Sequence, residues 1–252
     1  MAGHYNFQAL REHALKVYKF QQGKSIQALN PHGEINGGAI NAVHLPEDHF
    51  DLIKGGVCAS LTCAWLKEKR TRGGVFNGDS AGDAIHSERN RDTVMRAAPR
   101  QIQYSGNFQQ NDIVDLYRLK RNEDLDNVLV KSRVKFEQTL MSGYVQRGYR
   151  QVIEVQPSIV NACDPAYLKR GRGVYMSFTL KSTLEGRRGG GHAAGAYRSR
   201  GNHLYFFDSN CGVYQINDPD GFFGAWIDCY ANLGLAVTIN TTANDGFSYV
   251  GS

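Results

Sequence analysis

The chain of 252 residues lacks several features that mark whole classes of proteins. No apolar run approaches the roughly 20 residues of a membrane span, and the N-terminus lacks the apolar core of a signal peptide. The five cysteines are an odd number without paired spacing, which argues against a disulfide framework and favours a reducing compartment. We therefore expect a chain with no signal peptide and no transmembrane segment.

Motifs for metals and nucleotides are also missing. The sequence has no C-x-x-C pair, no H-E-x-x-H and no GxxxxGK[ST] loop, so structural zinc, metalloprotease and nucleotide sites have no support. The net charge of +5 is mildly basic, and its densest cluster, Lys67–Arg72, is typical of a solvated helix end. We expect no metal, no organic cofactor and no nucleic-acid partner.

One cysteine stands in an unusual setting. Cys58 follows Gly55 and Gly56 and precedes a run whose apolar spacing and basic last turn predict a helix over 59–70. A cysteine at a helix N-terminus meets unpaired N–H groups and the positive end of the dipole, which favour the thiolate. The remaining cysteines lack this setting and are interpreted as small buried hydrophobes: Cys63, Cys163, Cys211 and Cys229.

A hairpin supplies two partners for that thiol. The runs 192–197 and 203–208 flank a short polar stretch with Gly and Asn, which predicts two antiparallel strands and a loop of about five residues. If the turn is centred on Arg200, His192 lies directly opposite Asp208, with Cβ atoms about 5 Å apart. Both faces of the hairpin are apolar or small, so we expect it in the middle of a sheet.

Together these residues predict a catalytic triad. Cys58 is the expected nucleophile, His192 its general base and acid, and Asp208 the orienting carboxylate. Residues 48–57 contain neither Gln nor Asn, so no side-chain oxyanion donor is assigned, and Asn41 is the nearest upstream amide. The backbone N–H of Cys58 is the one oxyanion donor we name.

The spread of the triad predicts one integrated α+β domain over residues 1–252, with a helix-rich first half packed on a strand-rich second half. Five further segments are assigned from spacing and composition: a helix over 7–20, a loop-rich insertion over 73–111, a strand over 173–180, a helix over 222–233 and a strand over 235–239. The nucleophile block is placed at about 50–70 and the His/Asp sheet block at about 173–240.

Three blocks of this sequence resemble the YopT-type cysteine peptidases, a papain-like family found among bacterial effectors and toxins. They are Gly56–Leu61 followed by Trp65, Gly191–Tyr197, and Tyr205–Tyr214. Ser209 and Cys211 depart from the family pattern, which often has Pro and an aromatic there. The resemblance implies a papain-like cysteine protease fold and the same three roles for Cys58, His192 and Asp208.

The resemblance also implies a function. We expect a cysteine protease that attacks proteins of a target cell after delivery by a specialised secretion system. The same triad could instead deamidate a glutamine side chain or transfer it to an amine, because all three reactions share an acyl-enzyme intermediate. A protein-binding module that keeps the fold without catalysis is a further alternative.

Overall fold

The computed structural model describes most of the chain. The described residues are 8–27, 29, 47–53, 55–70, 88–106, 113–121, 155–184, 189–239 and 247–251. The helical elements are η1 (Gln8–Glu12), α1 (Gln22–Gln27), α2 (Glu47–Ile53), α3 (Cys58–Arg70), α4 (Glu88–Gly106), α5 (Ile113–Leu116), α7 (Val155–Ala162) and α8 (Pro219–Ala231). The strands are β1 (Ala14–Tyr18), β2 (Lys120–Arg121), β3 (Arg172–Ser182), β4 (Gly190–Arg198), β5 (Leu204–Asp208), β6 (Gly212–Ile216), β7 (Leu235–Ile239) and β8 (Phe247–Gly251).

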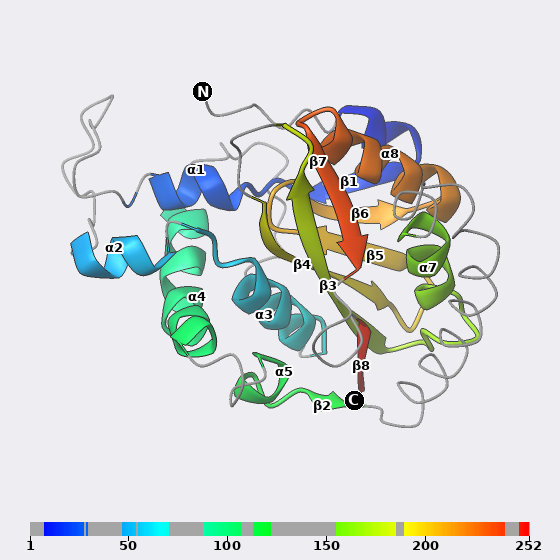
Figure 1. Ribbon diagram of the computed structural model, residues 1–252. Coiled ribbons are helices and arrows are strands. Elements are labelled where there is room, and N and C mark those ends of the chain that lie inside the picture. Colours follow the sequence, from blue (N-terminus) through cyan, green and yellow to red (C-terminus); the bar gives the residue numbers. More distant parts are fainter. Residues whose placement is uncertain are drawn as a thin grey trace, which may run out of the picture.

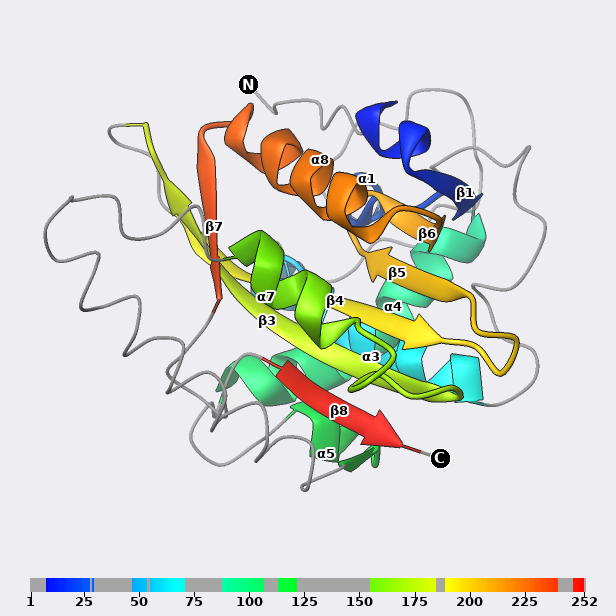
Figure 2. The ribbon, with the colours of Figure 1, turned by 90° about the vertical axis from the view of Figure 1, so that its right-hand side faces the viewer.

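Within the described residues, eight strands form one antiparallel sheet in the order β1-β6-β5-β4-β3-β8-β2, and β7 pairs with the end of β3. Helices cover both faces. Figure 1 shows α1 to α5 on one side of the sheet and α7 and α8 on the other, and Figure 2 looks onto the second side. The predicted α+β class and the central position of the β4–β5 hairpin are both confirmed.

Helix α3 packs closely against one face of the sheet. Trp65 of α3 stacks on Phe207 of β5, with ring centroids 5.5 Å apart. Gly195 of β4 makes this approach possible, because a Cβ there would lie 2.9 Å from Thr62 Cγ2. The Thr62 hydroxyl also donates to the Ala193 carbonyl over 3.2 Å. These contacts fix where α3 begins relative to β4, and so where Cys58 lies.

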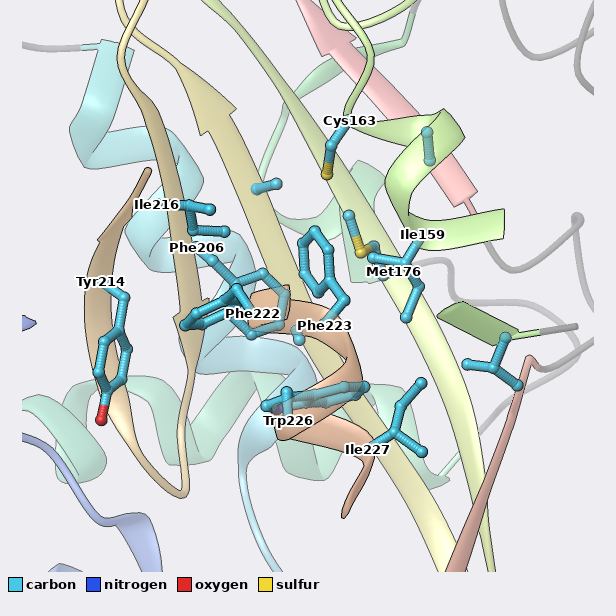
Figure 3. Close-up of a cluster of buried hydrophobic side chains, with 14 of the residues drawn as sticks. Ile159, Cys163, Met176, Phe206, Tyr214, Ile216, Phe222, Phe223, Trp226 and Ile227 are labelled. Atoms are coloured by element: carbon cyan, nitrogen blue, oxygen red, sulfur yellow. The ribbon is translucent and has the colours of Figure 1, made fainter. Parts of the chain in front are cut away.

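The α8 face carries an aromatic core. Phe206 of β5 lies edge-on to three rings of α8, Phe222, Phe223 and Trp226, at centroid distances of 5.3 to 5.6 Å (Figure 3). Alternate residues of β3, β4 and β6 also point to this face, as the period of two requires. The predicted strand over 173–180 and helix over 222–233 correspond to β3 and α8, and the strand over 235–239 to β7.

Two sequence predictions in the first half are wrong. The helix expected over 7–20 is a 3-10 turn followed by strand β1, because Ala14–Tyr18 pairs with β6 from the far end of the chain. Leu15 of this strand is 63% exposed. The described part of the supposedly loop-rich insertion over 73–111 is helix α4, which buries Val94, Ala97 and Ala98 at helical spacing. The rest of 73–111 lies outside the described residues.

Candidate active site

Cys58 is the first residue of α3, as the glycines before it predict. The turn that leads into the helix is closed by the Gly56 N–H, which donates to the Ile53 carbonyl over 2.8 Å. Gly56 has φ +115°, a conformation that residues with a Cβ rarely adopt. Two neighbouring N–H groups are already used: Val57 N–H donates to Gln22 and Ser60 N–H to Gln101. Cys58 itself is partly exposed.

His192 and Asp208 meet across the β4–β5 hairpin. The His192 Nε2 lies 3.1 Å from Asp208 Oδ1, and both residues are buried, with exposed fractions of 4% and 0%. Cys58 is close enough to His192 to raise the pKa of its imidazole. Because Nε2 faces Asp208, the Nδ1 atom is the one left for the thiol. The structure therefore brings the three predicted residues together in the order Cys58, His192, Asp208.

The predicted register of this hairpin is wrong by two residues. Asp208 pairs with Ala194 rather than His192, because the loop lies one residue later than expected. Asn202 takes a left-handed φ of +69° there, and Ser199 N–H donates to the His203 carbonyl. A shift of two keeps His192 and Asp208 on the same face as diagonal neighbours, which long side chains can still bridge.

Four donors surround the Asp208 carboxylate. Oδ1 accepts from His192 Nε2 and from the Asn210 N–H at 2.8 Å. Oδ2 accepts from Trp226 Nε1 and from the Tyr230 hydroxyl, each at 2.8 Å. A buried carboxylate is costly unless its lone pairs are satisfied, and here both oxygens have two partners. Asp208 is thus built to remain ionised inside the protein.

The charges of this pair support each other. Burial alone would lower the pKa of His192, but the charge and hydrogen bond of Asp208 and the contact with Cys58 raise it above its ordinary value. Burial would raise the pKa of Asp208, but His192, the Asn210 N–H and Trp226 together lower it. An imidazolium beside a carboxylate is therefore the favoured state of the pair, and a thiolate is the partner that this cation would stabilise.

Several polar residues of the site escape sequence reasoning. Trp226 and Tyr230 lie on a helix whose aromatic spacing predicts core, and their polar atoms reach Asp208 from within that core. Gln22, 36 positions before Cys58 in sequence, accepts from the Val57 N–H over 2.9 Å. No local motif marks it. Asn41, the upstream amide noted in the sequence, lies outside the described residues.

The other four cysteines are buried, as predicted, and Cys58 alone is partly exposed. Burial raises the pKa of Cys163, Cys211 and Cys229. The nearby charge of Asp208 adds to this rise for Cys211 and Cys229. Among the described residues, no three His, Cys, Asp or Glu side chains are grouped as metal ligands. The described helices include none long and apolar enough to cross a membrane.

Comparison with known families decides the class of this site. Residues 12–233 match the model of the peptidase C58 family, described as Yersinia/Haemophilus virulence surface antigen. The chain belongs to this family. It is a YopT-type cysteine peptidase, as the resemblance in the sequence implies. The match runs from just before β1 to just after α8, so it includes every residue of the site described above.

Other comparisons add less. The peptidase resembles the crystal structure of the Pseudomonas avirulence protein AvrPphB, with 14% sequence identity and a TM-score of 0.44. The alignment covers 79% of this chain and 93% of that chain. No curated protein gives a significant match to the sequence.

Proposed function

We propose that the peptidase hydrolyses a protein substrate through a Cys58–His192–Asp208 triad. The observation that carries this proposal is the arrangement of a partly exposed thiol beside a buried imidazole that is itself hydrogen-bonded to a buried carboxylate. Nucleophile, base and orienting acid are the three components that acyl transfer by cysteine requires. The family match supports the same reaction class.

The proposed reaction uses Nδ1 of His192, because Nε2 already contacts Asp208 and Tyr230. His192 Nδ1 takes the proton of Cys58, and the thiolate attacks the carbonyl carbon of the scissile amide. The C–N bond then breaks while the protonated His192 gives its proton to the leaving amine, which leaves a thioester on Cys58. Water, deprotonated by His192, attacks the thioester and releases the acid. Asp208 stays ionised throughout and stabilises the imidazolium.

The Cys58 N–H is our candidate for stabilising the negative oxygen that forms on the attacked carbonyl. It belongs to the first turn of α3, where N–H groups point out of the helix and the dipole favours negative charge. Its neighbours at Val57 and Ser60 already donate to side chains. The orientation of the helix towards the site therefore favours a tetrahedral oxyanion at its N-terminus.

We further propose that residues 1–252 act as one catalytic domain on proteins of a target cell into which the enzyme is delivered. One sheet unites strands from β1 to β8, which supports a single domain. The family description as a virulence surface antigen supports the role in a target cell.

The deciding experiment compares two alanine variants of the same helix. Target-cell lysate is incubated with the wild type, Cys58→Ala or Cys63→Ala, and new protein N-termini are identified by mass spectrometry. Cys63 is buried, so Cys63→Ala should keep the wild-type cleavage pattern. Cys58→Ala should lose it completely, because losing a nucleophile costs on the order of 10⁶ in rate. Cleavage by Cys58→Ala would exclude the triad.

The same samples distinguish the alternative reactions. A protease yields fragments, whereas a deamidase adds about one dalton to an intact substrate through the same acyl-enzyme chemistry. A transglutaminase would join an amine to the glutamine side chain without fragments. If the substrate is modified in a Cys58-dependent way without new N-termini, the proposed peptide-bond hydrolysis is wrong, and the triad performs deamidation or transglutamination instead.

A further inference from the structure

Gln22, the first residue of α1, contacts both halves of the site. Its side chain is buried, with 7% exposed, and its Oε1 accepts from the N–H of Val57, the residue before the nucleophile. Its Nε2 donates to Asn210 Oδ1 over 3.0 Å, and its backbone N–H donates to the Ser209 carbonyl over 2.6 Å. One residue thus joins the start of the nucleophile helix to the turn that follows Asp208.

The hydrogen bonds continue beyond Asn210. Asn210 Nδ2 donates to the Tyr230 hydroxyl over 3.0 Å, and that hydroxyl donates to Asp208 Oδ2 and lies 3.1 Å from His192 Nε2. We call Gln22, Asn210 and Tyr230 the bridging residues. They connect Val57 to Asp208 by an unbroken path of buried hydrogen bonds.

The direction of this path is fixed by chemistry. A backbone N–H can only donate, so the oxygen of the Gln22 amide must face Val57 and its nitrogen must face Asn210. The same logic turns the nitrogen of Asn210 towards Tyr230. Every bond therefore points the same way, towards the carboxylate, and aligned hydrogen bonds polarise one another.

The fit around Gln22 argues that it is more than a chance contact. Gly56 packs against the amide, and a Cβ at Gly56 would lie 3.4 Å from Gln22 Oε1. Without Gln22, the Val57 N–H and the Asn210 Oδ1 would each lose the partner that satisfies it. Buried polar groups without partners are costly, so the path holds its members in place.

We propose that Gln22 is a positioning residue that holds the Cys58 thiol against His192, acting through Asn210 and Tyr230. The inference rests on the proposed function, because the spacing matters only if Cys58 and His192 react together. Cys58 belongs to a helix on one face of the sheet, whereas the His192–Asp208 pair is packed by side chains of α8 on the other. The bridging residues join these two parts of the site by side-chain hydrogen bonds.

The test measures the alkylation of Cys58 by iodoacetamide, followed by peptide mass spectrometry across about pH 5 to pH 9, relative to glutathione. An ordinary thiol loses about tenfold in rate for each pH unit below its pKa of about 8.5, whereas a thiolate paired with an imidazolium stays reactive. Gln22→Met keeps the length of the side chain and removes both of its hydrogen bonds. We expect it to slow alkylation at about pH 6 by about tenfold or more and to leave the rate at about pH 9 within about twofold.

Two further variants separate positioning from folding. Gln22→Glu, when protonated in this buried site, can still accept from Val57 and donate to Asn210, so it should restore the wild-type rate at about pH 6. Gln27→Met places the same new side chain at the exposed end of α1 and should match the wild type. If Gln22→Met fails to fold, Asn210→Leu interrupts the same path without touching α1. It keeps the backbone N–H that donates to Asp208 and should lose the low-pH reactivity too.

The possible outcomes test the positioning role of Gln22 separately from the proposed triad. A wild-type Cys58 that follows the pH profile of glutathione would overturn the triad itself. A reactive wild type with unchanged profiles in folded Gln22→Met and Asn210→Leu would leave the triad standing and overturn the positioning role. A uniform fall in rate at all pH values, with the shape of the profile kept, would likewise assign Gln22 a structural role only.

Discussion

Strand β4 carries a buried basic side chain near each end, and the two are held in opposite ways. At the start of the strand, His192 is bonded by side chains: Asp208 at 3.1 Å, with Tyr230 also at 3.1 Å. At its last residue, Arg198 is bonded by main-chain carbonyls, those of Leu168 at 2.9 Å and of Cys163. Both residues are less than a tenth exposed.

The difference in partners predicts a difference in role. Carbonyl groups do not titrate, so the Arg198 contacts fix backbone geometry around the end of α7, and the charge of these partners does not change with pH. The partners of His192 are a carboxylate, a hydroxyl and a thiol, which can exchange protons or shift charge. Changes at the His192 end should therefore alter activity and pH dependence, whereas changes at the Arg198 end should alter stability.

Within this comparison of the two ends of β4, the largest effect is expected from Asp208→Asn. All four groups around this carboxylate donate hydrogen bonds to it, so the new amide nitrogen would face a donor whichever way it is turned. His192 would lose the acceptor that fixes its tautomer, and activity should fall by about 10⁴-fold. The measurement is the rate of substrate cleavage in lysate against enzyme concentration.

Asp228→Asn is the matched control for this change. Asp228 lies on α8, the helix that supplies Trp226 and Tyr230, but it is exposed to solvent. Its replacement should leave the cleavage rate within about twofold, since exposed substitutions of this kind change stability by less than about 0.5 kcal/mol. Equal losses in both variants would show that the helix surface, and not the buried carboxylate, governs activity.

Arg198→Met should destabilise the fold without altering the chemistry. The change removes three donated hydrogen bonds, including one to the Asn202 carbonyl, and leaves buried carbonyls without those donors. We expect a loss of about 3 kcal/mol in the free energy of unfolding, measured with urea. Arg200→Met, at an exposed position of the same hairpin, should cost less than about 0.5 kcal/mol. A shifted pH profile of Cys58 alkylation in Arg198→Met would contradict the prediction that the Arg198 end of β4 affects stability alone.

The sequence predicts the His192 end of β4 but not the contacts of Arg198 at the other end. Cys58, His192 and Asp208 each stand in a local pattern, a helix start or a hairpin strand, and local patterns can be read from neighbours in the sequence. The register error of two residues did not separate His192 from Asp208. Successive side chains of a strand alternate between the two faces, so a shift by two residues keeps each side chain on its face. A single-residue error would have hidden the pair.

The parts that could not be predicted depend on contacts between distant segments. The β1 segment looks helical until β6, about 200 residues later, offers it an edge to pair with. Tyr230 and Trp226 have the helical spacing of a core, and they do form one; only the position of their polar atoms shows a second role. Gln22 and Arg198 bond to groups that no sequence pattern marks as neighbours.

The smallest predicted effect is a pH dependence of stability at the His192 end. The pKa of His192 is raised in the folded protein, so the stability it contributes is fully present below its ordinary value of about 6.5. It is lost as the pH rises through the folded value, by up to about 1.4 kcal/mol for each pH unit. The free-energy difference between the wild type and His192→Gln, from urea unfolding, should therefore shrink between about pH 7 and pH 8.5.

An exposed histidine of the same hairpin serves as the control for this measurement. His203→Gln makes the same change of residue type just before β5, away from Asp208, and corrects for effects of pH on the rest of the protein. Curves for the wild type and His192→Gln that stay parallel over this range would mean that Asp208 does not hold the imidazolium in the folded state. The two ends of β4 would then differ in their partners but not in their capacity to respond to pH, and the proton transfer assigned to His192 would lose its electrostatic basis.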